Sequence, residues 1–134
     1  MTARLLKAAV GLGSLVITVA AFAQTGHPAK GSWLGYWGPN EDEQNRIRLL
    51  LDWKDRQITG VINPGRNAVP IEKAELDPGD WTLTIEAEMP VEGGGTEHYV
   101  VTGQLKNLGS WTNRVYEGTY RLGAESGKFR VALN

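Results

Sequence analysis

The residues of this chain that could act in catalysis are few and scattered. The sequence has no cysteine, and His27 precedes the first strand-like segment, which leaves His98 as the one histidine inside the patterned region. A serine hydrolase would need Ser32, Ser110 or Ser126 beside a histidine base. None of these serines lies in a recognisable nucleophile turn. The inventory therefore argues against nucleophilic chemistry by cysteine or serine.

Carboxylates offer a third kind of chemistry, because a glycosidase needs only two facing acidic side chains. Asp52, Asp55, Glu86 and Glu117 are the candidates in strand-like segments or tight turns. The chain has 15 acidic residues, however, so facing pairs arise by chance. A weak hydrolase would also need a cleft beside such a pair. We therefore expect a protein that is not an enzyme.

Two polar segments could bind ions, but neither has the required pattern. The six residues Asn40–Asn45 offer many oxygen ligands, yet they lack the spacing and the turn glycine of a calcium-binding loop. Gly93–Gly95 is not followed by a helix that could bind phosphate, so it indicates a flexible hairpin tip. We expect no metal and no cofactor. Arg46 and Arg48 would share one strand face and could bind an anionic partner, although neighbouring acidic strand residues are the more ordinary partners.

Aromatic side chains are the strongest candidates for ligand binding. One hypothesis assigns an apolar or ring-containing ligand to an aromatic lining, and the residues of this lining are Trp37, Trp53, Trp81, Tyr99 and Tyr120. The alternative is that the same rings fill the core. The choice depends on the direction of each ring, which depends on the elements that carry it.

About eight segments alternate apolar and polar residues, which is typical of half-buried strands. The clearest is Trp81 to Met89, in which Trp81, Leu83 and Ile85 are expected on one face. The eight segments are 31–38, 46–53, 57–63, 69–76, 81–89, 97–105, 114–122 and 128–133. Four of them contain an internal glycine, which permits a sharp bend or a bulge; these are Gly35, Gly60, Gly103 and Gly118.

The connections between these segments are short, which favours antiparallel pairing. We therefore predict an all-β fold, an antiparallel up-and-down β-barrel of about eight strands, with a β-sandwich as the alternative. A helix at Glu41–Trp53 is a local rival, because Ile47, Leu50 and Leu51 have helical spacing. The alternation from Ile47 to Trp53 favours a strand there, with Leu50 as the exception.

The N-terminal residues resemble a secretory signal peptide. Arg4 and Lys7 precede an uncharged stretch, residues 8–22, and Ala21–Ala23 has the small-x-small pattern of a cleavage site. A retained anchor is the alternative, but 15 residues are fewer than the roughly 20 that span a bilayer. We expect a signal peptide at 1–23, a polar tail at 24–30, one domain at 31–134, and a periplasmic or secreted product.

Removal of the signal peptide changes the charge balance. Two of the 14 basic residues leave with it, so 12 basic residues face 15 acidic ones and the formal net charge falls from −1 to −3. This mildly acidic balance argues against nucleic acid or an anionic membrane as partner.

Gly31-Ser32-Trp33 at the start of the first strand, together with Arg130 on the last, resembles the signature of the calycin superfamily, which includes lipocalins and avidins. The resemblance implies a barrel whose closed end holds Trp33 under the cation of Arg130, or of Arg121 in its place. No ligand-binding residue is carried over from these families.

Two functional hypotheses follow. In the first, the protein is an exported small-ligand binding protein of lipocalin or avidin type, with the ligand at the barrel mouth opposite Trp33 and beside the loop Gly93–Gly95. In the second, it is a protein-binding module, such as an inhibitor or assembly factor of the cell envelope. Such a module would use Asn40–Asn45 and Leu108–Asn113, including Trp111, around a solid core.

Overall fold

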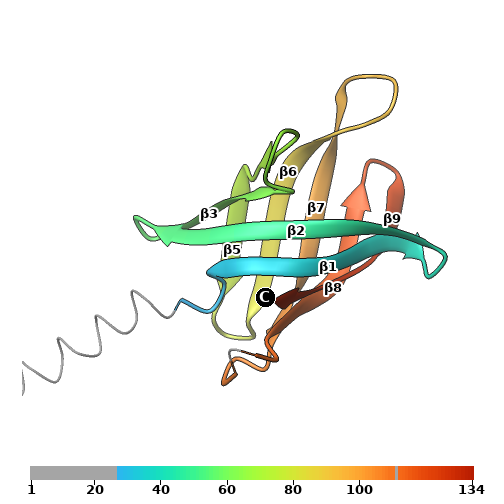
Figure 1. Ribbon diagram of the computed structural model, residues 1–134. Helices are drawn as coiled ribbons and strands as arrows, with labels where there is room; N and C mark the ends of the chain where they lie inside the picture. The colour runs from blue at the N-terminus through green and yellow to red at the C-terminus, as the bar shows by residue number, and fades with distance from the viewer. Residues whose placement is uncertain (1–26, 111) are drawn as a thin grey trace, which may run out of the picture.

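The chain forms a single curled sheet of nine antiparallel strands (Figure 1). The computed structural model describes residues 27–110 and 112–134, so the predicted signal peptide and Trp111 lie outside the described residues. In this described part, no helix has the length and apolar character to cross a membrane. The strands are β1 (Gly31–Asn40), β2 (Glu43–Lys54), β3 (Gln57–Ile62), β4 (Val69–Pro70), β5 (Lys73–Asp77), β6 (Thr82–Pro90), β7 (Thr96–Lys106), β8 (Val115–Leu122) and β9 (Glu125–Leu133).

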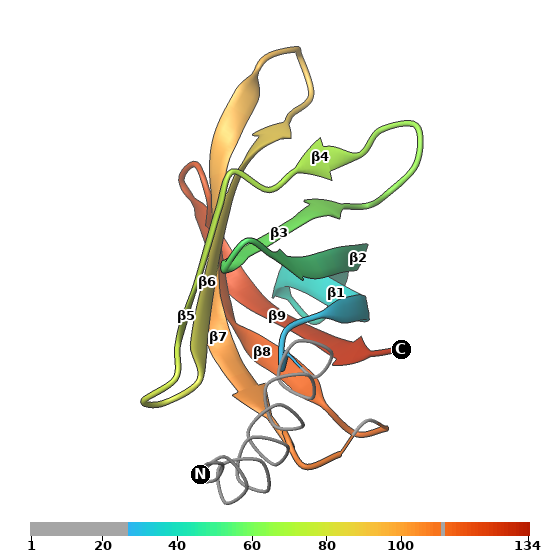
Figure 2. The same ribbon diagram turned by 90° about the vertical axis from the view of Figure 1, so that its left-hand side faces the viewer.

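The first and last strands pair with each other, which makes the sheet curl into a barrel-like shape. The strand order is β4-β3-β2-β1-β9-β8-β7-β6-β5, and β1 pairs with both β2 and β9. β1 and β2 cross in front of β5 to β8 in Figure 1, and Figure 2 shows β1 to β4 on one side, β5 to β7 on the other, and β8 and β9 between them. The prediction of an all-β, antiparallel up-and-down fold is confirmed. Pairing is continuous through one sheet.

The sheet is not closed by strand pairing, because the segment expected as one strand at 69–76 is divided. Its first part, β4, pairs with β3, and its second part, β5, pairs with β6. Between them the Ile71 N–H donates to the Gly60 carbonyl on β3, and the Glu72 N–H donates to the Glu86 carbonyl on β6. The chain itself thus crosses from one sheet edge to the other. We call the unpaired gap between β3 and β5 the seam.

Inward-facing side chains fill the interior. Along β6 every second residue from Leu83 to Met89 is buried, as the alternation predicts, and β2 buries Ile47, Leu49 and Leu51 in the same way. Leu50 is exposed on the outer face, which explains why it broke the pattern, and the helical alternative for this segment is wrong. The largest fully buried side chains are Trp33, Tyr99, Tyr116, Tyr120, Leu49, Ile62, Leu83, Ile85 and Val131. Four of these side chains are aromatic, and they pack in the core.

Two of the four strand glycines face each other where β7 and β8 approach closely. Gly103 is the register partner of Gly118. A Cβ on Gly103 would collide with the Glu117 carbonyl, and its other near neighbour is the ring of Phe129. A Cβ on Gly118 would collide with the Thr102 carbonyl. The missing side chains therefore permit the close backbone contact that bends this wall of the sheet over the core.

Candidate functional site

Three of the five predicted ligand-binding rings form a cluster with one another. Trp37 on β1 packs against Tyr99 with ring centroids 5.3 Å apart and against Tyr120 at 4.8 Å. Tyr99 and Tyr120 are both buried, and burial raises the pKa of each. The Tyr120 hydroxyl donates to Glu125 Oε2 at 2.6 Å. These three rings pack against one another, so they belong to the core.

The other two predicted rings, Trp53 and Trp81, line a hollow of about 740 Å³ beside the seam. Trp53 comes from the end of β2, and Trp81 precedes β6. Apolar side chains of β3, β5 and the segment before β5 complete the walls; these are Ile58, Ile71, Ala74 and Leu76. Charged side chains lie among the lining residues as well, and these are Arg56, Glu72, Lys73 and Glu75. We call this the seam hollow.

His27 forms part of the seam hollow by stacking on Trp53. The two ring centroids are 4.1 Å apart and the planes are inclined by 16°. The Ala29 N–H donates to Nδ1 of His27 at 3.2 Å, and burial lowers the His27 pKa. Both observations favour the neutral ring. The described part of the segment expected as a polar tail, 27–30, therefore packs against the barrel, and Ala29 is fully buried.

Trp81 has an unusual backbone conformation at the edge of the seam hollow. Its φ is +61°, a left-handed value that costs a bulky residue about 1–2 kcal/mol. Its N–H donates to the Asp77 carbonyl at 2.8 Å, and its carbonyl accepts from the Leu105 N–H at 3.0 Å. These bonds hold the indole 37% exposed, outside the buried row that starts at Leu83. The expectation that Trp81 shares the face of Leu83 is wrong, because the turn rotates it before β6 begins.

We keep the name closed end for the end of the barrel that contains Trp33. The side chains at this end are not arranged as predicted for Gly31, Trp33 and Arg130. Trp33 is fully buried there, and its indole N–H donates to the Ala29 carbonyl at 2.9 Å. Arg130 does not cover it. Phe129 and Val131 point inward, so Arg130 points outward, where its side chain is 67% exposed. Arg121, the predicted substitute, is exposed as well.

Arg114 is the buried cation at this end, and the sequence reasoning did not find it. Its side chain is 4% exposed. Nη1 donates to the Pro28 carbonyl at 3.1 Å and Nη2 to the Leu108 carbonyl at 2.7 Å. Arg114 thereby ties the segment before β1 to the loop after β7. The only signal in the sequence is its place directly before an apolar strand residue, Val115, which is too common to be specific.

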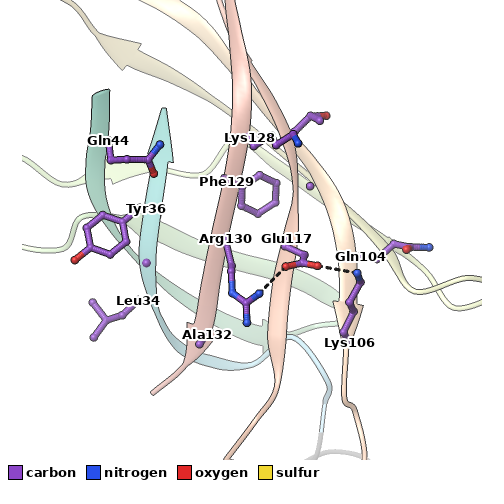
Figure 3. Close-up of a pocket in the computed structure, with 13 residues that line it drawn as sticks. Leu34, Tyr36, Gln44, Gln104, Lys106, Glu117, Lys128, Phe129, Arg130 and Ala132 are labelled. Atoms are coloured by element: carbon purple, nitrogen blue, oxygen red, sulfur yellow. Dashed lines mark hydrogen bonds and ion pairs between the residues drawn. The ribbon is translucent and has the colours of Figure 1, made fainter. Parts of the chain in front are cut away.

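A larger hollow of about 900 Å³ lies on the outer face of the sheet, over β1, β9, β8 and β7 (Figure 3). Glu117 lies within it and accepts from Lys106 at 2.7 Å and from Arg130 at 3.0 Å. The Lys106 hydrogen bond is the main cause that lowers the Glu117 pKa, and Arg130 adds to it. None of the five predicted ligand-binding rings lines this hollow.

In the described part of the chain, no serine hydroxyl forms a hydrogen bond with a histidine side chain. The Ser110 hydroxyl accepts from the Thr112 and Asn113 N–H groups, and the Ser32 hydroxyl accepts from Arg48. His98 lies instead between two carboxylates of β6, with Nδ1 2.6 Å from Glu88 Oε2 and Nε2 2.9 Å from Glu86 Oε1. Among the described residues, no group of three or more His, Asp or Glu side chains is arranged to hold a metal.

The His98 contacts predict a pH-dependent stability. The hydrogen bonds to Glu88 and Glu86 raise the His98 pKa above its ordinary 6.5, and the contact with His98 lowers the Glu88 pKa below its ordinary 4.5. The raised pKa stabilises the fold fully below pH 6.5, and that contribution is lost as pH rises through the folded value. The lowered Glu88 pKa contributes above pH 4.5 and is lost as pH falls through its folded value.

We therefore expect the free energy of unfolding of the wild type to exceed that of His98→Gln most strongly between pH 4.5 and 6.5. Urea unfolding of both proteins across this range and up to pH 9 measures the difference. A constant difference at all pH values would show that His98 contributes no charge-dependent stability.

Comparison of the chain with protein-family models, with curated proteins and with solved structures gives no match. The resemblance to calycins therefore stays a prediction from sequence, and the site must be interpreted from its own geometry.

Proposed function

We propose that this protein is an exported binding protein for a small ring-containing ligand, and that the ligand binds in the seam hollow. The observation that carries the proposal is Trp81, a large apolar ring held partly exposed on a strained backbone at the edge of a hollow. Strained residues persist where the surrounding structure enforces them, and they cluster at ligand sites. A core role would not need the exposure.

The lining of the seam hollow supports a ring-containing ligand with a polar substituent. Trp53, already stacked on His27, and Trp81 provide aromatic surfaces that favour offset or edge contacts with another ring. The apolar side chains, such as Ile58 and Leu76, favour a desolvated ring system. The charges of Lys73 and Glu75, whose Nζ and Oε1 lie 3.8 Å apart, can contact a polar group of the ligand.

Tryptophan fluorescence tests this proposal. Benzoate, p-cresol, nicotinamide and adenine serve as ring-containing probes, and at least one is expected to give a saturable change. Because two aromatic contacts would be lost, Trp53→Ala combined with Trp81→Gly should weaken that binding about tenfold or more. Glycine is chosen because it accepts the left-handed backbone at position 81.

Leu50→Ala is the matched control, since Leu50 is a large exposed apolar residue on the outer face. It should bind the probe as the wild type does. A flat titration with every probe, or equal weakening by the control, would contradict the proposal.

The alternative proposal is a protein-binding module of the envelope. One specific observation favours it: exposed cations and apolar side chains lie together on the outer face of β2, β1 and β9. The seam hollow and this outer face are separate surfaces, so the two proposals do not exclude each other.

A further inference from the structure

A cross-strand row on the outer face places Tyr36 between two arginines. Tyr36 on β1 is the register partner of Arg46 on β2 and of Arg130 on β9. Directly opposite side chains on one face of an antiparallel pair have Cβ atoms about 4.5–5.5 Å apart. The Tyr36 side chain is 49% exposed, and an arginine is its register partner on each neighbouring strand.

The next row has an aliphatic residue on β1 and an arginine on one side only. Leu34 on β1 is opposite Arg48 on β2 and Ala132 on β9. Tyr36 and Leu34 both line the outer hollow over β9 and β8, and both also line a second hollow of about 340 Å³ that contains Arg46 and Arg48. The two residues therefore form a low ridge with a basic depression on each side.

The cations of this face exceed the carboxylates that could neutralise them. Lys106 and Arg130 share the single carboxylate of Glu117 (Figure 3). Arg46 and Arg48 form no ion pair with any residue of the described ranges; Arg48 donates to the Ser32 hydroxyl. Lys128, on the same face, is likewise in no ion pair with a described residue. The ordinary expectation, that acidic strand neighbours pair with Arg46 and Arg48, is wrong.

This surface is basic in a chain whose formal net charge is −1. Charge segregation of this kind steers association with an oppositely charged partner. We propose that the outer face of β2, β1, β9, β8 and β7 binds an extended acidic peptide segment of a partner protein, with its carboxylates on Arg46, Arg48 and Arg130 and its apolar side chains on Tyr36 and Leu34.

The exposed apolar side chains that lie between the cations indicate which class of partner fits this face. A peptide that alternates acidic and apolar residues complements both kinds of contact, whereas an anionic polysaccharide or a nucleic acid backbone complements the charges alone. The dimensions also fit. Neighbouring strands lie about 4.8 Å apart, so the four gaps from β2 to β7 span about 19 Å, the length of about six extended residues.

The probe for this proposal is a synthetic peptide of about eight residues, long enough to exceed that span, in which glutamate alternates with leucine or tyrosine. Binding is measured by fluorescence anisotropy of a label on the peptide. Arg46→Glu combined with Arg48→Glu should weaken binding at least about tenfold, and binding should weaken as salt rises from about 0.05 to 0.5 M. Lys54→Glu combined with Arg66→Glu is the matched control, because it makes the same change of charge at exposed positions beside the turns on either side of β3.

Both variants change exposed side chains, and circular dichroism with thermal unfolding verifies that they fold. Selective loss in Arg46→Glu/Arg48→Glu supports the proposal. Equal loss in both variants would show binding by net charge and would overturn it, as would the absence of binding by the wild type. Tighter binding of polyglutamate or of a sulfated polysaccharide than of the alternating peptide would overturn the assignment to an acidic–apolar peptide.

Discussion

Replacement of Trp33 by alanine is expected to lower the free energy of unfolding by about 4 kcal/mol, the range found for removal of a large buried aromatic ring. Trp33 is fully buried and packs edge-on against Tyr116 with ring centroids 6.4 Å apart. The substitution removes this ring from the filled interior and also leaves the Ala29 carbonyl without its indole donor. Urea unfolding followed by circular dichroism measures the loss.

Trp81→Ala is the matched control for this prediction, because it removes the same side chain from a partly exposed position. Its expected loss is about 1 kcal/mol or less, as for most surface substitutions. Trp33→Phe should fall between the two, since it retains most of the ring but not the N–H. If Trp33→Ala were no more destabilising than Trp81→Ala, Trp33 could not be the centre of the closed end.

Arg114→Met is expected to destabilise the protein by about 3 kcal/mol, because two carbonyl groups lose their donors in a region with little access to water. These are the carbonyls of Pro28 and Leu108, which Arg114 joins across the closed end. Methionine keeps the length and apolar stem of the side chain, so the loss reports the guanidinium contacts. Chemical denaturation gives the free energy of unfolding.

Arg130→Met provides the comparison, since it makes the same substitution at the arginine that the sequence suggested for this role. Its exposed ion pair with Glu117 should contribute about 0–1 kcal/mol. The reverse order, with Arg130→Met the more destabilising, would show that the closed end is held as the calycin resemblance implies and not by Arg114.

Most of the strands could be predicted because their signal is local. The alternation along β2 and β6 reports which face is buried at each position, and turn residues such as Asp77-Pro78-Gly79-Asp80 mark the ends. The same alternation places Arg130 outside, between inward Phe129 and Val131, and applying it strictly would have excluded Arg130 from the closed end.

The features that could not be predicted depend on residues distant in the sequence. The division of 69–77 into β4 and β5 depends on where the edges of β3 and β6 lie, since Ile71 bonds to Gly60 and Glu72 bonds to Glu86. The burial of Ala29 and Arg114 likewise depends on two segments that meet at the closed end. A local sequence pattern does not specify which distant segments will meet.

The candidate site was predicted in part for the same reason. Aromatic composition indicated five rings, and two of them, Trp53 and Trp81, line the seam hollow. The rings of Trp37, Tyr99 and Tyr120 could either line a cavity or fill the core. The outcome depends on the total volume of the side chains that all the strands direct into the same part of the barrel. That sum is a property of the assembled sheet, and the structure shows that the rings pack on one another.

The central claim is that a ring-containing ligand binds in the seam hollow and not in the interior of the barrel. The NMR signals of the tryptophan indole N–H groups test this claim most directly. The ¹⁵N-labelled protein is titrated with the probe that gives the saturable fluorescence change, and we predict that the signals of Trp53 and Trp81 shift with a common saturation curve. The signals of Trp33, whose N–H is buried against the Ala29 carbonyl, and of Trp37 should stay in place. Shifts at Trp33 and Trp37 without shifts at Trp53 and Trp81 would contradict it, because the ligand would then occupy the interior.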